Sequence, residues 1–392
     1  RGGVGTDTRS TPGRAPAPGA WREGRTVTVL ERAEFEPMTR VVVAVVACLL
    51  FASAAVAEPD PNDWDAVIAE AYGQTVYWHA WAGFPRANAY IAWASRQVAE
   101  QFGVTVEHVK LSDTAEAVSR VVAEKAVGQH RGGAVDLIWI NGENFQALKA
   151  QALLFGPWAE ALPNWQYVDV EGKPAVTLDF MVPTEGYEAP WGMAHLVFYY
   201  DSARVERAPR TILALLTWAE LHPGRFTFPQ PPDHLGTTFL KQVLYELMPD
   251  SGVFRKQVDS VEYTAAAARL WQYMDALTPH LWRSGAAYPQ NGPRQIQLMA
   301  DGEIDLAISF NPNEASAAIE NFELPETVRT AVLDAGTISN ASFLAIPYNA
   351  TAKAGALVLA NFLLSPEAQL RKLDPAIWGN DTVLSLEKLS GE

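Results

Sequence analysis

Strand-like and helix-like patterns alternate from Gln74 onward, and this alternation constrains the fold more than any other feature of the sequence. Gln74–Trp78 is β-branched and aromatic, and apolar residues then recur at spacings of three and four from Ile91 to Phe102. Val104–Val109 alternates in polarity, and the later segment Ala134–Ile140 is nearly all apolar. Strands that alternate with helices in this order predict a parallel sheet with right-handed crossovers.

Helix-start signals support this reading. Asp113 and Glu116 have the spacing of a capping box, and a further helix should begin near Asn144. Near the C-terminus, Ser365 and Pro366 have the residue types preferred at an N-cap and at the first helical position.

A second set of elements follows the first, which predicts a second α/β lobe. We expect strands at Arg225–Pro229 and Ile304–Phe310, and helices at Thr237–Leu247 and Thr264–Leu277. The apolar segment Pro190–Tyr200 lies between the two sets and is expected to be a strand that connects them.

The length of the chain also favours two lobes. Without residues 1–57, 392 − 57 = 335 residues remain, more than the roughly 250–300 residues at which one hydrophobic core usually divides. We assign residues 58–190 and 335–392 to lobe 1, and residues 191–334 to lobe 2.

The N-terminal region has the pattern of a secretory signal peptide at residues 38–57. Met38-Thr39-Arg40 precedes the uncharged run Val41–Ala52, and Ala55-Val56-Ala57 is an Ala-x-Ala cleavage site. We therefore expect export, cleavage after Ala57 and a periplasmic location. A membrane anchor and a lipid attached to Cys48 are the alternatives.

Residues 1–37 are rich in Arg, Gly and Pro and begin with Arg1. We interpret them as upstream sequence translated from a misplaced start, or otherwise as a disordered tail.

Charge argues against nucleic acid and anionic membranes as partners. Residues 1–57 hold seven Arg and five acidic residues, so the remainder carries 30 − 7 = 23 basic and 45 − 5 = 40 acidic residues, a formal charge of −17. A surface of this sign repels phosphate backbones and acidic lipids.

The motifs of common catalytic sites are absent from the sequence. It contains no Gly-x-Ser-x-Gly elbow, no His-Glu-x-x-His helix, no phosphate-binding loop and no dinucleotide fingerprint. The histidines are dispersed, with no pair spaced to bind one metal. We expect a protein without enzymatic activity, metal or cofactor. Paired carboxylates can be far apart in a chain, so a secreted hydrolase of glycosides or esters stays an alternative.

Ligands of open parallel sheets bind beyond the carboxyl ends of the strands. Candidate ligand residues therefore occur in the segments that follow the predicted strands and at the segment that joins the lobes, and they combine aromatic faces with amides, hydroxyls and a carboxylate. The candidates are Trp81, Asn141, Glu143, Asn144, Trp191, Thr237, Thr238, Asn311 and Asn340. Asn141 and Asn144 also suit a turn or helix cap, and Thr237 suits an N-cap.

Several strings resemble the YnjB-type substrate-binding proteins of ABC transporters, a branch of the extracellular solute-binding superfamily. They are Asp136–Phe145, Leu162–Trp165, Asn361–Pro366 and Gln369–Lys372. The resemblance runs from about Gly73 to Leu384. Members of this family usually continue beyond the position that corresponds to Glu392, so further helices are expected there.

The resemblance implies a two-lobed type II periplasmic-binding fold, with a ligand cleft between lobes that are each built on a mainly parallel sheet. It also implies docking onto a membrane permease that is driven by an ATPase, by a protein that acts as a monomer. For the ligand we favour an organic cation, thiamine-like or polyamine-like, because Trp81 offers an aromatic face and Glu143 a counter-charge. A sugar is the alternative, since sugars also stack on Trp and hydrogen-bond to Asn and Glu.

Overall fold

The computed structural model describes residues 58–248, 250–255 and 260–389. These residues belong to one compact unit that begins at Glu58. The expected signal peptide, the upstream segment and Cys48 lie outside the described residues.

Most described strands are short, and they form one sheet of five strands, one of three and a small hairpin. In chain order the strands are β1 (Thr75–Trp81), β2 (Thr105–Leu111), β3 (Leu137–Ile140), β4 (Leu178–Asp179), β5 (Val182–Pro183), β6 (Glu188–His195), β7 (Val197–Asp201), β8 (Leu306–Ser309), β9 (Val328–Ala331) and β10 (Ser339–Ala345).

The described α-helices are α2 (Trp64–Ala71), α3 (Pro85–Phe102), α4 (Ala115–Ala126), α5 (Glu143–Ala150), α6 (Ile212–Leu221), α7 (His234–Leu247), α8 (Ser260–Leu277), α9 (Gly292–Ala300), α10 (Glu314–Glu320), α11 (Lys353–Leu363), α12 (Pro366–Leu373) and α13 (Leu386–Leu389). Short 3₁₀ segments are η1 (Ala159–Ala161), η2 (Pro163–Tyr167), η3 (Pro174–Thr177), η4 (Ser251–Arg255), η5 (Thr278–His280) and η6 (Trp282–Gly285).

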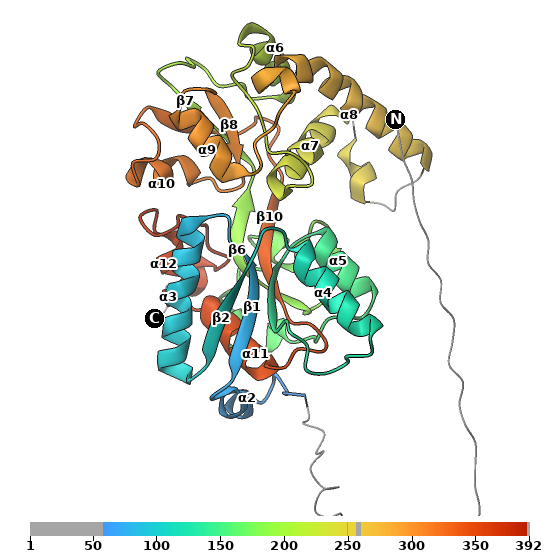
Figure 1. Ribbon diagram of the computed structural model, residues 1–392, viewed down its shortest axis with the longest axis vertical. Helices are drawn as coiled ribbons and strands as arrows, with labels where there is room; N and C mark the ends of the chain where they lie inside the picture. Colours follow the sequence, from blue (N-terminus) through green and yellow to red (C-terminus); the bar gives the residue numbers. More distant parts are fainter. Residues whose placement is uncertain (1–57, 249, 256–259, 390–392) are drawn as a thin grey trace, which may run out of the picture. The chain divides into compact units, whose positions relative to one another are not determined.

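The five-stranded sheet has the order β2-β1-β3-β10-β6. β1 pairs in parallel with β2 and β3, which confirms the alternating pattern of the first half of the sequence. β10 joins this sheet antiparallel to both β3 and β6. In Figure 1, α4 and α5 lie on one side of this sheet, and α3 and α12 lie on the other.

The three-stranded sheet differs from the sequence prediction in two respects. Its order is β8-β7-β9, and β7 is antiparallel to both neighbours, so this sheet is not mainly parallel. The predicted strand Arg225–Pro229 is wrong as well, since only Phe226 makes an isolated parallel bridge, to Leu306. β7 follows β6 after a single residue, Leu196, and becomes the central strand of the second sheet. The residue pattern does not encode that its partners β8 and β9 run in the opposite direction.

β6 and β10 connect the two sheets. β6 leads directly into β7, and the chain returns from β9 to β10, so both strands run between the five-stranded and the three-stranded sheet (Figure 1). The backbone N–H of His195 donates to the carbonyl of Phe310 at 3.0 Å, and that of Leu196 donates to Ile338 at 3.0 Å. Where domains close around a ligand, the hinge consists of a few residues in loops or at the ends of elements, and the residues around Leu196 and Ile338 have this position.

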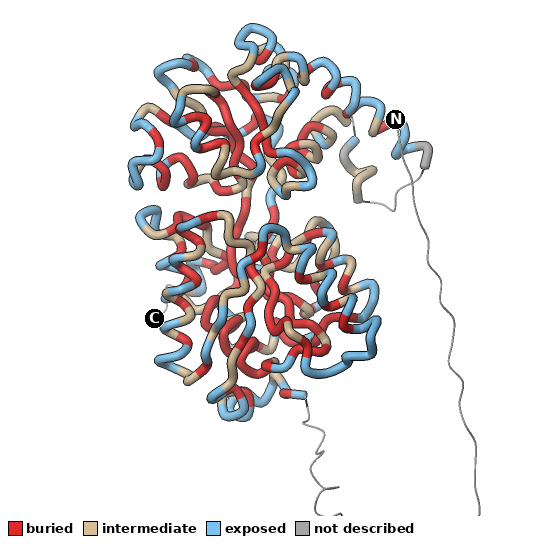
Figure 2. The backbone as a smooth tube through the Cα atoms, in the orientation of Figure 1, coloured by how far each residue is buried: buried red, intermediate tan, exposed pale blue. Residues whose placement is uncertain are grey.

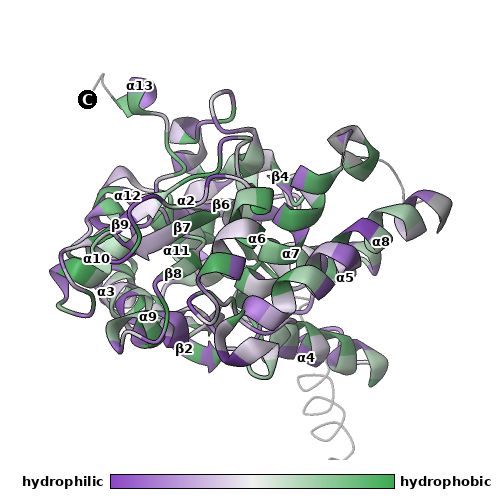
Figure 3. Ribbon diagram, turned by 90° about the horizontal axis from the view of Figure 1, so that it is seen from above, coloured by the Kyte–Doolittle hydropathy of each residue, from purple (hydrophilic) through white to green (hydrophobic). Residues whose placement is uncertain are grey.

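Buried apolar side chains form two clusters. One fills both faces of the five-stranded sheet and continues among residues of α9, β8 and α10. The other packs β7 and β8 against α6, α7 and α8. Figure 2 shows the strands as the most buried parts, and Figure 3 shows helices that carry both polar and apolar residues, as amphipathic covering helices do.

Both helix-start predictions are confirmed. The Glu116 carboxylate accepts a hydrogen bond from the N–H of Asp113 at 3.0 Å, and Ser365 Oγ accepts one from the N–H of Ala368 at 3.2 Å. The predicted cap at Thr237 is wrong: α7 begins three residues earlier, because Asp233 accepts hydrogen bonds from the N–H groups of Leu235 and Gly236.

Candidate functional site

The loop between β3 and α5 presents polar residues at the carboxyl end of the parallel strands. Asn141 follows β3, and its Nδ2 donates to the carbonyl of Ala341 on β10 at 2.7 Å. Gly142 caps α5 at a positive φ of 56°, which glycine adopts without steric cost. Glu143, the first residue of α5, is exposed and makes no ion pair with the described residues.

A buried carboxyl group fixes this loop. Asp179, at the end of β4, accepts a hydrogen bond from the N–H of Gly142, and its Oδ1 accepts another from Asn340 Nδ2 at 2.7 Å. Asn340 Oδ1 in turn accepts from the N–H of Phe180 at 3.0 Å. The buried side chains of Asp179 and Asn340 therefore join the loop after β3 to the β4–β5 hairpin and to the connecting strand β10.

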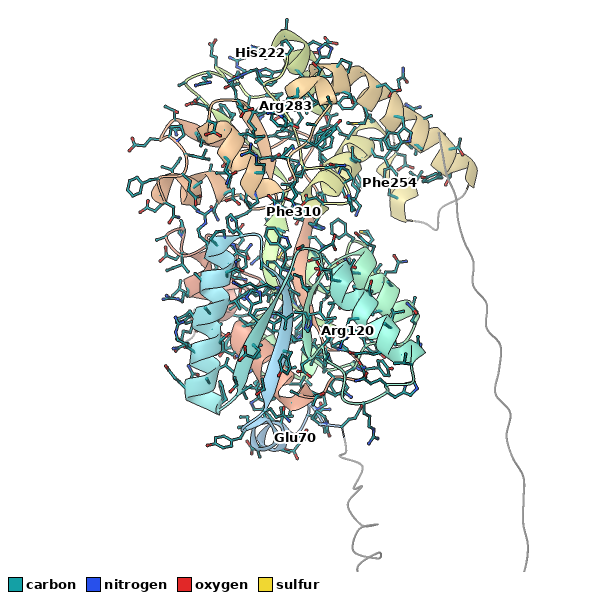
Figure 4. All side chains as sticks on the ribbon, viewed as in Figure 1. Glu70, Arg120, His222, Phe254, Arg283 and Phe310 are labelled. Carbon is teal, nitrogen blue, oxygen red and sulfur yellow. The ribbon has the colours of Figure 1, made fainter. Side chains whose placement is uncertain are left out.

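Aromatic side chains from both sheets meet at Phe180. Its ring lies 5.7 Å from that of His234, the first residue of α7, and the His234 ring lies 5.4 Å from that of Phe310, which follows β8. Both pairs are close to edge-on, a favourable arrangement. Figure 4 labels Phe310 where the three-stranded sheet approaches β6 and β10.

The ammonium group of Lys241, on α7, lies 4.3 Å from the centroid of the Phe180 ring. We refer to the residues of this region as the Phe180 cluster. It consists of Asn141, Gly142, Glu143, Asp179, Phe180, His234, Lys241 and Phe310.

Burial and neighbouring charges shift the pKa values of two members. The pKa of Asp179 is raised to about 7, chiefly by burial and also by the charge of Glu143, while its hydrogen bonds and Lys241 act in the opposite direction. Burial, and then Lys241, lower the pKa of His234. The lowered pKa favours the neutral His234 ring at pH 7.

The predicted residues of the five-stranded sheet have different surroundings. Trp81, at the end of β1, is half-buried and its indole lies against Gly83, where a Cβ atom would come within 2.3 Å of it. Asn144 is half-buried in the first turn of α5. Asn340 is buried, and its amide hydrogen-bonds to Asp179, Phe180 and Ala341. It therefore positions residues of the Phe180 cluster.

Trp191 lies apart from the Phe180 cluster. It is 0 % exposed and packs with Trp78, Trp139 and Trp378 at ring distances of 4.8–5.5 Å. A side chain without exposed surface offers no face to a solute in this structure. Proline and glycine beside it in the sequence suggested a strand mouth, yet β6 is buried through almost its whole length.

The predicted residues of the second sheet lie near α7 and after β8. Thr237 is half-buried in the first turn of α7. Thr238 is buried, and its Oγ1 has no partner among the described residues. Asn311 Oδ1 caps the next turn through the N–H of Asn313 at 3.1 Å, and its Nδ2 has no described partner.

Sequence reasoning missed Asp179, Phe180, His234, Lys241 and Phe310. Phe310 ends a predicted strand and His234 begins a helix whose start was placed too late, so both could have been found from strand and cap signals. Asp179 and Phe180 belong to a hairpin with strands of two residues, too short to show a pattern.

A cavity of about 370 Å³ lies elsewhere, and Arg86, Tyr90, Trp93, Glu323 and Arg371 are among its lining residues. None of the predicted site residues lines it. Among the described residues, no group of three or more His, Cys, Asp or Glu side chains could hold a metal ion. In the same part of the chain, no helix combines the length and apolar character needed to cross a bilayer.

Solved structures of low sequence identity show which fold this chain has. The periplasmic binding protein AfuA of Actinobacillus pleuropneumoniae, with bound fructose-6-phosphate, matches with a TM-score of 0.58 at 15 % identity over 79 % of this chain and 85 % of that one. The spermidine/putrescine ABC transporter substrate-binding protein PotD of Streptococcus pneumoniae matches at 0.58 and 14 % identity, over 80 % and 87 %. The ferric binding protein of Campylobacter jejuni matches at 0.58 and 14 % identity, over 79 % and 87 %. The chain has the type II periplasmic-binding fold.

Sequence comparison gives the family. The family model described as bacterial extracellular solute-binding protein matches residues 93–377, and this chain belongs to that family. It is 44 % identical over 328 residues to the protein YnjB of Escherichia coli (strain K12), covering 84 % of each chain. The resemblance to the YnjB type is confirmed. Members of the family bind substrates for transport, so the expectation of a binding protein rather than an enzyme is confirmed too.

Proposed function

We propose that this protein is the exported solute-binding component of an ABC importer and that it captures a small organic cation at the Phe180 cluster. The ligand would bind between a lobe of residues 58–190 and 335–392 and a lobe of residues 191–334. Delivery would follow docking of the monomeric, ligand-bound form onto a membrane permease with its cytoplasmic ATPase. Cleavage after Ala57 would release the protein into the periplasm.

The choice of a cation depends on one observation, the gathering of carboxylates around Phe180 and His234. Glu143 raises the pKa of Asp179, and Asp113, in the loop before α4, raises the pKa values of Asp233 and His234. These electrostatic effects require short separations. With the His234 ring neutral, the carboxylates of Glu143 and Asp113 outnumber the ammonium group of Lys241 even when Asp179 is protonated, which favours a positively charged solute.

The aromatic rings suit the same ligand. A cation attracts the negative face of Phe or Trp with about 0.5–2 kcal/mol, more when water is excluded. Trp81 ends β1 of the five-stranded sheet, and Phe180 lies in the β4–β5 hairpin, which is hydrogen-bonded to β10 through Asn340. His234 begins α7 and Phe310 follows β8 of the other sheet. Among the solved relatives by fold, PotD is named as a spermidine/putrescine-binding protein, which is consistent with cation binding on this architecture.

Closure follows from placing ligand contacts on both sides. A ligand shifts an equilibrium between open and closed forms only by its difference in affinity for them, so groups of both lobes must touch it. β6 and β10 would supply the hinge, because they are the strands that connect the sheets.

A thermal-shift screen tests the proposal. Thiamine, spermidine, putrescine and choline would form the cationic arm, and amino acids and sugars would form the other arms. A solute at 100 times its dissociation constant stabilises the folded protein by about 2.7 kcal/mol. A hit among the cations that Glu143→Gln weakens supports the proposal, and a hit only among sugars would replace the cation with the sugar alternative.

A further inference from the structure

The Phe180 ring is held in one direction by an unusual backbone. Phe180 and Met181 connect β4 to β5, and their φ angles are +41° and +73°. A non-glycine residue in this left-handed region is sterically unfavourable, so surrounding contacts must hold it. The hydrogen bond from Phe180 N–H to the buried Asn340 does so, and Gly142 packs against the ring, since a Cβ atom there would lie 3.3 Å from it.

The face of this ring is occupied by a cation from the opposite side. Lys241 belongs to α7, which packs on the three-stranded sheet, yet its Nζ lies 4.3 Å from the Phe180 centroid. Within the described residues Lys241 makes no ion pair and no hydrogen bond through Nζ. Among the described residues, the ammonium group is thus held by no hydrogen bond or ion pair but contacts the Phe180 face.

The surroundings of Nζ are suited to an ammonium group in general. Lys241 lowers the pKa of Asp179, as a positive charge near that carboxyl must, and Glu143 lies close enough to Asp179 to raise it. An aromatic face with acidic groups beside it is the arrangement that binds alkylammonium ligands.

We infer that the Phe180 face is the subsite for an alkylammonium group of the ligand, and that Lys241 fills this subsite as an intramolecular competitor when no ligand is bound. The inference rests on the proposed function, because it requires a cationic ligand. A ligand must displace Lys241, so its apparent affinity is the intrinsic affinity reduced by the fraction of molecules in which the face is vacant. Lys241 thereby selects for solutes that make additional contacts, such as one to Glu143.

Two substitutions test this competition with spermidine, choline and thiamine as probes in calorimetric titrations at low salt. Lys241→Met keeps an apolar side chain of similar length and removes the charge, so we expect the dissociation constant of a bound probe to fall by about tenfold. Phe180→Leu should raise it by about tenfold. The control is Arg269→Met, at an exposed position of α8, a helix that packs with α7. It also removes one positive charge and should change the dissociation constant less than about twofold.

A second readout observes Lys241 itself. In protein whose lysines carry ¹³C-dimethyl groups, the signal that Lys241→Arg removes should be shifted upfield by the Phe180 ring. It should lose that shift when a probe binds, and in Phe180→Leu.

The outcomes separate the two proposals. If a probe binds the unmodified chain and Lys241→Met weakens it or leaves it unchanged, Lys241 is a ligand contact or a bystander, and the competition is refuted while cation binding stands. If none of the probes binds either the unmodified chain or Lys241→Met, both the competition and the cation proposal are refuted.

Discussion

The guanidinium of Arg86 lies 2.7 Å from the carboxylate of Glu314, and each residue is only 9 % exposed. Arg86 is in the first turn of α3, which follows β1 of the five-stranded sheet. Glu314 begins α10, which follows β8 of the three-stranded sheet. The pair therefore joins the two sheets at a point separate from the Phe180 cluster. The pKa of Glu314 is raised to about 7, because the effect of burial exceeds the opposing effect of Arg86.

Arg86→Met should destabilise the protein by about 3 kcal/mol at pH 8, because it leaves a buried carboxylate without its partner. The loss should be smaller at pH 5, where Glu314 is already protonated. Urea unfolding at the two pH values measures this. Arg96→Met, on the exposed side of the same helix, is the matched control. Equal effects of the two variants at both pH values would show that the ion pair does not contribute.

Glu188 should make stability fall as pH rises. It is 0 % exposed, both carboxylate oxygens have no described partner, and burial, followed by the charge of Asp179, raises its pKa well above the usual value. A raised carboxyl pKa means that the folded form holds a proton that the unfolded form has lost, so stability is highest in acid and is lost toward the folded pKa.

Glu188→Gln should therefore leave the unfolding free energy nearly unchanged at pH 4 and increase it at pH 9. Denaturant titrations across this range measure the difference, with the exposed Glu206→Gln as control. A variant that is less stable than the parent at pH 9 would mean that the carboxylate has an unrecognised partner.

The burial of the Lys372 side chain should reduce the free energy of unfolding. It is 0 % exposed, its Nζ has no described hydrogen-bond partner and lies 5.3 Å from the Trp191 ring centroid, and burial lowers its pKa well below the usual value. A lowered amine pKa means that the unfolded form binds the extra proton, so this group reduces stability most at low pH.

Lys372→Met should raise the unfolding free energy at pH 7 by about 1–3 kcal/mol, the usual cost of an unsatisfied buried polar group. The gain should be larger at pH 6 than at pH 9. Exposed Lys110→Met is the control for lost charge. A loss of stability in Lys372→Met at each pH would show that its amine is held by a favourable interaction.

The first half of the fold could be predicted from the sequence because β1 is buried at alternate positions, β3 is buried along nearly its whole length, and amphipathic helices separate the strands. In the second half, the helices that end at Leu247 and Leu277 and the strand within Ile304–Phe310 were predicted, but the pairing of the three-stranded sheet was not, since it is antiparallel and joins strands separated by long stretches of chain. Nothing in the local pattern around Tyr199 reports that its neighbours are Ala307 and Thr330.

For the same reason, only part of the candidate site could be predicted from the sequence. Asn141 and Glu143 follow a strand whose burial the sequence makes obvious, so their position could be inferred. Phe180 reaches the same place through the short hairpin Leu178–Pro183, which is fixed by Asn340, 160 positions away. Trp191 was misplaced because an aromatic residue between Pro190 and Gly192 suits a strand mouth and a core equally well.

Trp81→Ala and Glu143→Gln should each weaken binding of a cationic probe by about tenfold, because each removes an aromatic face or a counter-charge. Calorimetric titration measures the change, and unfolding experiments should show that Glu143→Gln is as stable as the parent. Glu107→Gln, exposed on β2, is the matched control. Unchanged affinity in both site variants would place the ligand elsewhere.

Small-angle X-ray scattering of the chain with and without a saturating cationic probe tests the central claim most directly. Capture by both lobes predicts a smaller radius of gyration in the bound state, and Glu143→Gln should require more probe to reach it. A probe that binds tightly while the scattering curve stays the same would contradict capture by closure.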